Sequence, residues 1–173
     1  SDILVEHDVT FDLYQQIFER EWRFGAMWNW WRWWRFEMAA VKRMRQVVVM
    51  AEKDQQTLGI AHSTVLANGV DLSRFVPVPE PAAHRLLFVG SFRHFPNVTA
   101  FRFFFEEVWP LVRGVLPDAE LEVVAGPDHL RYWNDAPSTG PGVTVHGFVS
   151  DVVPLYARAN VVLSPTLVSA GTN

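Results

Sequence analysis

The sequence predicts an α/β protein of the doubly wound type, in which helices connect mostly parallel strands. Three observations support this prediction. Short runs rich in Val, Leu and Phe alternate with helical segments beyond residue 84. Several runs end in a glycine or proline turn and lead into a helix instead of a tight hairpin, which favours parallel pairing with right-handed crossovers. The 173 residues are 49% apolar, which is enough to build a buried core.

Residues 1–76 are predicted to form part of a first domain. Spacings of three and four between apolar residues indicate a helix before Gly25, and Thr10 or Asp12 is expected to cap it. The composition after Gly25, with no proline or glycine, indicates a second helix. A β-branched run then indicates a buried strand. The expected order is strand 2–6, helix 11–24, helix 28–44, strand 45–51, helix 52–58 and strand 62–70.

Residues 77–173 are predicted to form part of a second domain, because the prolines at 77, 79 and 81 keep residues 75–83 extended. Asn97 is expected to cap the long helix of this domain. Residues 169–173 resemble a loop before a further helix, so we expect a fragment that lacks parts of both domains. The expected order is strand 85–90, helix 97–117, strand 119–126, strand 143–147, helix 151–159 and strand 160–165.

Composition excludes several classes of function. The absence of cysteine removes disulfides, thiolate metal sites and a cysteine nucleophile, and favours a cytoplasmic location. A net charge of −4 and a pI near 5.8 argue against a nucleic-acid partner. The sequence has no run of eighteen apolar residues, so no membrane span is predicted. The scattered histidines predict no metal site, and Glu106, Glu107, Asp118, Glu120 and Glu122 are expected to lie on solvated faces.

Residues 20–45 combine tryptophan and positive charge. This segment holds six of the eight tryptophans and seven of the fifteen basic residues, against Glu21 and Glu37. On a helix, the tryptophans from 28 to 34 cover an arc of about 220°, which is wider than one core-facing stripe needs. One hypothesis is peripheral contact with a membrane, with arginines at headgroup phosphates, and replacing Trp30, Trp33 and Trp34 would test it. The alternative is packing inside the domain or against a partner.

Glycine-bearing turns after parallel strands could offer backbone N–H groups to a phosphorylated ligand. Neither a Walker pattern nor G-x-G-x-x-G is present, so a nucleoside triphosphatase or a common type of dehydrogenase is disfavoured.

Four segments of the chain together resemble a known family. In chain order they are VLANGVDLSRF, RLLFVGSFRHFPNV, LEVVAGP and VTVHGFVSDVVPLYARANVVLSPTLVSAGTN. Their order and spacing resemble the nucleotide-sugar-binding half of family 4 glycosyltransferases. The upstream LVEHDVTFDLYQQ and RQVVVMAEKDQQTL resemble the last part of that family's acceptor domain.

This resemblance implies a GT-B fold, with a Rossmann-like donor domain and the C-terminal part of a Rossmann-like acceptor domain. His7 matches a histidine that faces the donor sugar; the alternative is a structural histidine beside Glu6 and Asp8. Arg93 is assigned to the diphosphate, because Ser91 and Pro96 stand where many members have an arginine and a lysine. The other residues implied to bind the donor are Gly90, Ser91, Gly126, Phe148, Val149, Gly171 and Thr172.

The implied function is retaining transfer of a sugar from a nucleoside-diphosphate sugar, of UDP or GDP type, to an acceptor hydroxyl, without a metal or other cofactor. The acceptor would be a sugar, a lipid-linked glycan or a cell-surface glycan, met at the inner face of the cell membrane. Ala170 stands where the family has the first glutamate of its E-x7-E element. Two alternatives therefore remain open: a nucleotide or sugar-phosphate binding module without turnover, and a membrane-docking or partner-docking protein acting through the tryptophan-rich helix.

Overall fold

The computed structural model describes residues 2–133 and 140–167, which form two compact units. Unit 1 ends at Val70 and unit 2 runs from Asp71 to Leu167, so the division lies a few residues before the boundary expected after residue 76. Each unit contains a parallel sheet with helices packed against it. The predicted α/β class with parallel strands is therefore confirmed.

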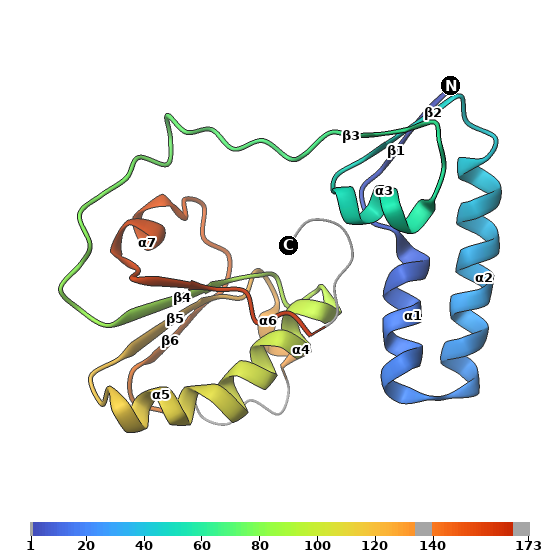
Figure 1. The fold of residues 1–173 in the computed structure, drawn as a ribbon. Helices are drawn as coiled ribbons and strands as arrows, with labels where there is room; N and C mark the ends of the chain where they lie inside the picture. Colours follow the sequence, from blue (N-terminus) through green and yellow to red (C-terminus); the bar gives the residue numbers. More distant parts are fainter. Residues whose placement is uncertain (1, 134–139, 168–173) are drawn as a thin grey trace. The chain divides into compact units, whose positions relative to one another are not determined.

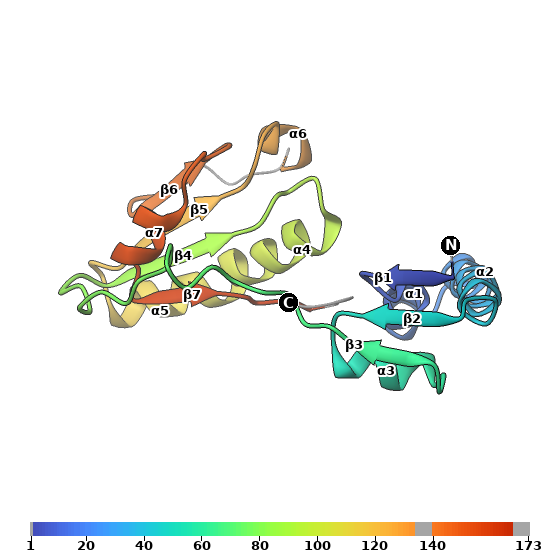
Figure 2. The same cartoon turned by 90° about the horizontal axis from the view of Figure 1, so that it is seen from above.

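Unit 1 is built on a three-stranded parallel sheet with the order β1-β2-β3, and Figure 2 shows the three strands side by side. The predicted elements are all present, although the strands are shorter than expected and Gly25 lies inside the second helix. Their bounds are β1 Ile3–Glu6, α1 Thr10–Glu21, α2 Phe24–Val41, β2 Gln46–Val49, α3 Glu52–Leu58 and β3 Ser63–Val65.

The helices α1 and α2 form an antiparallel hairpin (Figure 1). Trp22 ends α1 in the left-handed conformation, with φ of 49°, and its N–H donates to the carbonyl of Phe18. This turn reverses the chain within two residues. The hairpin packs on the sheet through a core whose buried members are Val9, Phe11, Val41, Val47, Val49 and Leu58.

A buried carboxylate on α2 caps α1, contrary to the prediction that Thr10 or Asp12 would cap it. Val9 is the cap residue and makes no side-chain cap. Instead, Glu37 Oε1 accepts from the Thr10 N–H at 3.0 Å, and Oε2 accepts from the Phe11 N–H at 2.9 Å. Glu37 is 5% exposed, so its charge is compensated by the orphan N–H groups at the positive end of α1.

Replacing Glu37 by glutamine should destabilise unit 1 by about 1–3 kcal/mol, because a charge-assisted cap becomes a neutral one and a buried N–H loses its acceptor. Urea denaturation followed by tryptophan fluorescence would report mainly on unit 1. Glu21→Gln, at an exposed position of α1, is the matched control and should change stability by less than about 0.5 kcal/mol. Equal effects of the two variants would contradict the capping role.

The tryptophans of α2 divide between two sides of the helix. Trp30 and Trp33 pack against the core of unit 1, and their rings stack on Phe18 and Tyr14 with centroid separations of 6.3 and 6.0 Å. Trp28, Trp31 and Trp34 are exposed. A variant that removes Trp30 and Trp33 would therefore damage the core, which makes it a poor test of membrane contact.

Unit 2 contains a four-stranded parallel sheet with the order β6-β5-β4-β7 (Figure 2). All predicted strands are present, and α6 was not predicted. The elements are β4 Arg85–Val89, α4 Phe95–Phe103, a π-helical segment Phe104–Val108, α5 Trp109–Val115, β5 Glu120–Val124, α6 His129–Tyr132, β6 Val143–His146, α7 Val153–Arg158 and β7 Val161–Leu163.

Helices cover both faces of this sheet, as the doubly wound prediction requires. The helices α4 and α5 lie on one face and α7 lies on the other (Figure 1). On the first face, Phe88 and Leu121 join a core with Phe92, Phe101 and Trp133. On the second face, the buried residues are Leu87, Val124 and Leu155. Neighbouring residues of β4 thus point to opposite cores.

The single helix predicted over 97–117 is instead two α-helices joined by the π-helical segment Phe104–Val108. Pro110 follows this segment closely. Because proline has no N–H and its ring clashes with the carbonyl four residues earlier, a wider turn accommodates it. The proline was visible in the sequence, but its local consequence was not predicted.

Glu122 was expected on a solvated face, and this prediction is wrong. Its side chain is 15% exposed and accepts from Arg158 Nε at 2.8 Å and Nη2 at 2.6 Å. His146 Nε2 lies 3.1 Å from Glu122 Oε2. The Arg158 hydrogen bonds hold the pKa of Glu122 below its usual range, although burial opposes them. The ion pair between Arg158 and Glu122 connects α7 to β5.

Candidate functional site

The parallel register of unit 2 gathers the predicted donor-binding turns at one edge of the sheet. Val89 lies opposite Val124, and Val124 lies opposite His146, so the three strands end level with one another. The loops that follow are joined by main-chain hydrogen bonds. The Phe92 N–H donates to the Ala125 carbonyl at 2.8 Å, and the Gly126 N–H donates to the Gly147 carbonyl at 3.1 Å.

Gly90 lies at a closely packed point of this edge. A Cβ atom there would lie 3.0 Å from Asn97 Cγ and 3.1 Å from the Phe88 ring. Its N–H donates to the Val124 carbonyl at 3.0 Å, so this donor continues the ladder between β4 and β5. Gly90 therefore has a structural role whether or not a ligand contacts it.

Gly126 is the tightest point of the edge. It has a φ of +78°, and a Cβ atom there would lie 2.8 Å from Ser91 Oγ. The loop after β4 and the loop after β5 can approach one another this closely because position 126 has no side chain. The structure thus brings together Gly90, Ser91 and Gly126, three of the residues predicted to bind the donor.

Asn97 holds the first loop in shape. It was predicted to cap the helix, but His94 is the cap residue and Asn97 lies inside α4. Its Nδ2 donates to the Ser91 carbonyl at 3.0 Å, while the Ser91 Oγ lies 3.4 Å from the Arg93 N–H. The position of Ser91 is therefore fixed from both sides.

Arg93 projects from this loop and pairs with Asp128 from the loop after β5. Both side chains are exposed, at 53% and 61%. The hydrogen bond to Asp128 and its charge raise the pKa of Arg93 above its already high value. Asp128 adopts the left-handed conformation with φ of 56°. Sequence reasoning did not single out Asp128; its place two residues after Gly126 was the available signal.

Phe148 and Val149, predicted to contact the nucleotide base, have different surroundings. Phe148 follows β6 and is 75% exposed, so its ring offers a free face to a ligand. Val149 packs partly against the core that contains Leu87 and Leu155. Gly171 and Thr172 lie outside the described residues.

In unit 1, His7 and Glu6 lie at the carboxyl end of β1. His7 is exposed, whereas Glu6, the residue before it, is half-buried. Burial, followed by the charges of Glu37, Asp8 and Asp54, raises the pKa of Glu6 from 4.5 to about 7. Glu6 therefore changes charge near neutral pH, directly beside the predicted sugar-facing histidine.

Neither a metal cluster nor a membrane-spanning helix is found in the part of the chain that the structure describes. Over residues 2–133 and 140–167, no group of three histidine or acidic side chains is arranged to hold a metal ion. Across the same described residues, no helix combines the length and the apolar character needed to cross a membrane.

Residues 83–173, more than half of the chain, match the family model of the group 1 glycosyl transferases. The chain therefore belongs to this family. No curated protein gives a match to the sequence.

Among solved structures, the fold is similar to that of TarM. A structure of an S. aureus TarM point mutant in complex with fondaparinux, alpha-GlcNAc-glycerol and UDP matches at 10% identity and a TM-score of 0.57. A second structure, of TarM itself, matches at 9% identity and a TM-score of 0.58. Each match covers 76% of this chain and 27% of the other, so the chain spans about a quarter of their length. The likeness confirms the Rossmann-like, GT-B type of fold.

Replacing Gly126 by alanine should lower the stability of unit 2 by about 1–3 kcal/mol, because a side chain at positive φ is strained and its Cβ meets Ser91. Chemical denaturation followed by circular dichroism measures this. Gly114→Ala is the matched control: open space surrounds that position in α5, so the substitution should be neutral or stabilising by up to about 1 kcal/mol. Similar losses for both would contradict the packing account.

Glu6 should make unit 1 less stable as the pH rises. Its pKa is higher in the folded state, at about 7, than in the unfolded state, so the folded protein holds more protons between about pH 4.5 and 7. The contribution of protonated Glu6 to the stability of unit 1 is fully present below this window and is lost as the pH rises through 7. Allowing for solvent screening, the loss should be about 1–2 kcal/mol.

Urea denaturation at pH 5 and pH 8, for the wild-type chain and Glu6→Gln, checks this dependence. The glutamine variant should gain stability over the wild type at pH 8 and show less gain at pH 5. Burial also raises the pKa of Asp54, so the variant keeps part of the pH dependence. Identical pH profiles for the two proteins would rule out the role of Glu6.

Proposed function

We propose that this chain carries the donor-binding half of a retaining family 4 glycosyltransferase, which transfers a sugar from a UDP or GDP sugar to an acceptor hydroxyl. Membership of the group 1 glycosyl transferases supports sugar transfer. A structure of TarM, which has a similar fold, was determined with UDP, and this supports a nucleoside-diphosphate donor. The retaining outcome and the family 4 assignment rest on the sequence resemblance.

The observation that carries the proposal is the exposed arginine beside two close-packed glycine turns. Arg93 extends from a loop that hydrogen bonds of Ser91 and Asn97 hold, and Asp128 pairs with its guanidinium at the edge. A diphosphate at the edge would accept from Arg93 through two oxygens and displace Asp128 as its partner. Such an arrangement stabilises the charge that develops on the departing diphosphate.

The proposed reaction needs no metal or other cofactor. The bond between the anomeric carbon and the diphosphate oxygen breaks, and its electron pair leaves with the diphosphate. The acceptor oxygen bonds to the same face of that carbon, and its proton passes to the diphosphate. His7 would hydrogen-bond the sugar, and Phe148 with the main chain of Val149 would contact the base. Gly171 and Thr172 would add N–H groups to the phosphates.

The acceptor is proposed to be a sugar or a lipid-linked or cell-surface glycan, met at the inner face of the cell membrane. Residues 20–45 would bring the chain to that surface. A second candidate is a module that binds nucleotide without turnover, which Ala170 favours because it stands where the family has a glutamate. Strong nucleotide affinity with no sugar transfer would support this second function.

Calorimetric titration of the chain with UDP, GDP and ADP tests the donor site. One nucleotide should bind selectively, and Arg93→Ala should weaken it at least about tenfold, which is the loss of one charge-assisted contact of about 1.4 kcal/mol. Arg102→Ala, which removes an exposed arginine from α4, is the matched control and should leave the affinity unchanged.

Asp128→Asn is a second variant, which should raise nucleotide affinity where Arg93→Ala lowers it. Asparagine tolerates the left-handed backbone of this position but competes less well for Arg93, so nucleotide affinity should rise. No binding of any nucleotide, or equal losses for Arg93→Ala and Arg102→Ala, would overturn the assignment of this edge as the donor site.

A further inference from the structure

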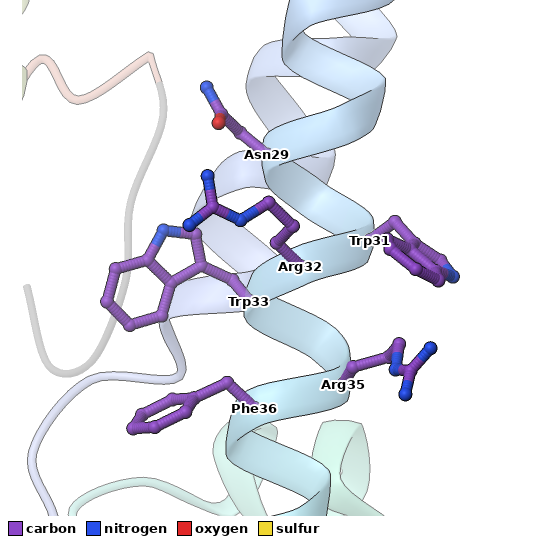
Figure 3. A pocket seen from close by; sticks show the side chains of 6 residues that line it. All are labelled: Asn29, Trp31, Arg32, Trp33, Arg35 and Phe36. Carbon is purple, nitrogen blue, oxygen red and sulfur yellow. The ribbon is translucent and has the colours of Figure 1, made fainter.

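The outer side of α2 carries an aromatic stripe that the core of unit 1 does not use. Phe24, Trp28, Trp31 and Arg35 are spaced by four, three and four residues, which places them within an arc of about 60° on a helix. Glu37 and Val41, which face the core, project from the opposite side. Figure 3 shows Trp31 and Arg35 on one side of α2 and Trp33 and Phe36 on another.

The aromatic rings of this stripe are exposed, and two of them pack against one another. Phe24 is 77% exposed and Trp28 is 49% exposed, although both are large apolar side chains. Trp28 and Trp31 stack with centroids 5.0 Å apart, and the Arg35 guanidinium lies 4.9 Å from the centre of the Trp31 ring. Trp28 and Trp31 therefore form an exposed, stacked apolar pair, with the Arg35 guanidinium against the Trp31 ring at one end of the stripe.

Positive charge surrounds the stripe. Arg23 at the hairpin turn and Arg32 on α2 are exposed, and Trp22 beside the turn is 80% exposed. Glu21 lies 4.0 Å from Arg23 in an exposed ion pair and offsets part of its charge. At the far end of α2, the chain adds further basic residues, which are Lys42, Arg43 and Arg45.

This combination matches the chemistry of a bilayer surface more closely than that of a protein partner. Indoles favour the boundary between headgroups and acyl chains, and arginines beside them pair with phosphate. A protein interface tends to have a centre depleted of charge, whereas Arg32 and Arg35 project from the same helix as the exposed rings and Arg35 lies against Trp31. The excess of basic residues complements an anionic leaflet.

We propose that the outer stripe of α2, with Trp22 and Arg23 at the hairpin turn, binds an anionic lipid surface. The helix would lie parallel to the membrane plane, with its aromatic side chains at the acyl boundary and its guanidinium groups at lipid phosphates. Its purpose rests on the proposed function, because it would bring unit 1 to a lipid-linked acceptor. The binding itself requires no nucleotide.

Co-sedimentation of the chain with lipid vesicles tests the proposal without any nucleotide present. The chain should bind vesicles of phosphatidylcholine with about 30% phosphatidylglycerol, and bind phosphatidylcholine alone more weakly. The double variant Trp28→Ala/Trp31→Ala should reduce binding about tenfold or more. Leu111→Ala/Leu130→Ala, which removes two exposed apolar side chains from unit 2, is the matched control and should bind as the wild type does.

Two further measurements distinguish lipid binding from a loss of folding and from self-association. Arg32→Glu/Arg35→Glu should abolish the preference for the anionic vesicles. Brominated acyl chains should quench the tryptophan fluorescence of the unmodified chain, which no loss of folding could imitate. The absence of vesicle binding and quenching would overturn the proposal, and so would self-association of the chain that Trp28→Ala/Trp31→Ala abolishes. Nucleotide binding would remain intact in either case, so this failure is distinct from failure of the donor site.

Discussion

The parallel pairing of β4 with β5 is the constraint on which the candidate donor site depends. Because Val89 and Val124 lie opposite one another, the two following loops begin at the same edge and must pass within contact of each other. Glycine at position 126 makes that approach possible, and the Phe92 N–H then bonds across to the second loop. Arg93 reaches Asp128 because these main-chain contacts bring the two loops together.

A buried carboxylate plays the corresponding part in unit 1. Glu37 joins α2 to the first turn of α1, so the hairpin has one side committed to the core. The consequence appears on the opposite side of α2, where Trp28 and Trp31 remain exposed and stacked. The helix α2 thus carries two aromatic faces, which explains why its tryptophans cover so wide an arc around the helix axis.

The fold was largely predictable because strands and helices leave local patterns. The runs at 85–90 and 119–126 contain β4 and β5, and glycine after each strand marked the edge of the sheet. Contacts between distant residues left no such pattern. Glu37 caps a helix that begins 27 residues earlier in the sequence, and Arg93 meets Asp128 from 35 residues away. Only the folded chain shows which carboxylate meets which donor.

The edge formed by the loops after β4 and β5 is proposed to bind a nucleoside diphosphate. The most direct measurement is the amide NMR spectrum of the isotope-labelled chain, titrated with UDP and then with GDP. We expect saturable shifts at Ser91, Arg93 and Gly126 with one of the two nucleotides, while the amides of α2 stay unchanged. Shifts confined to unit 1, or no shifts with either nucleotide, would show that this edge is not the donor site.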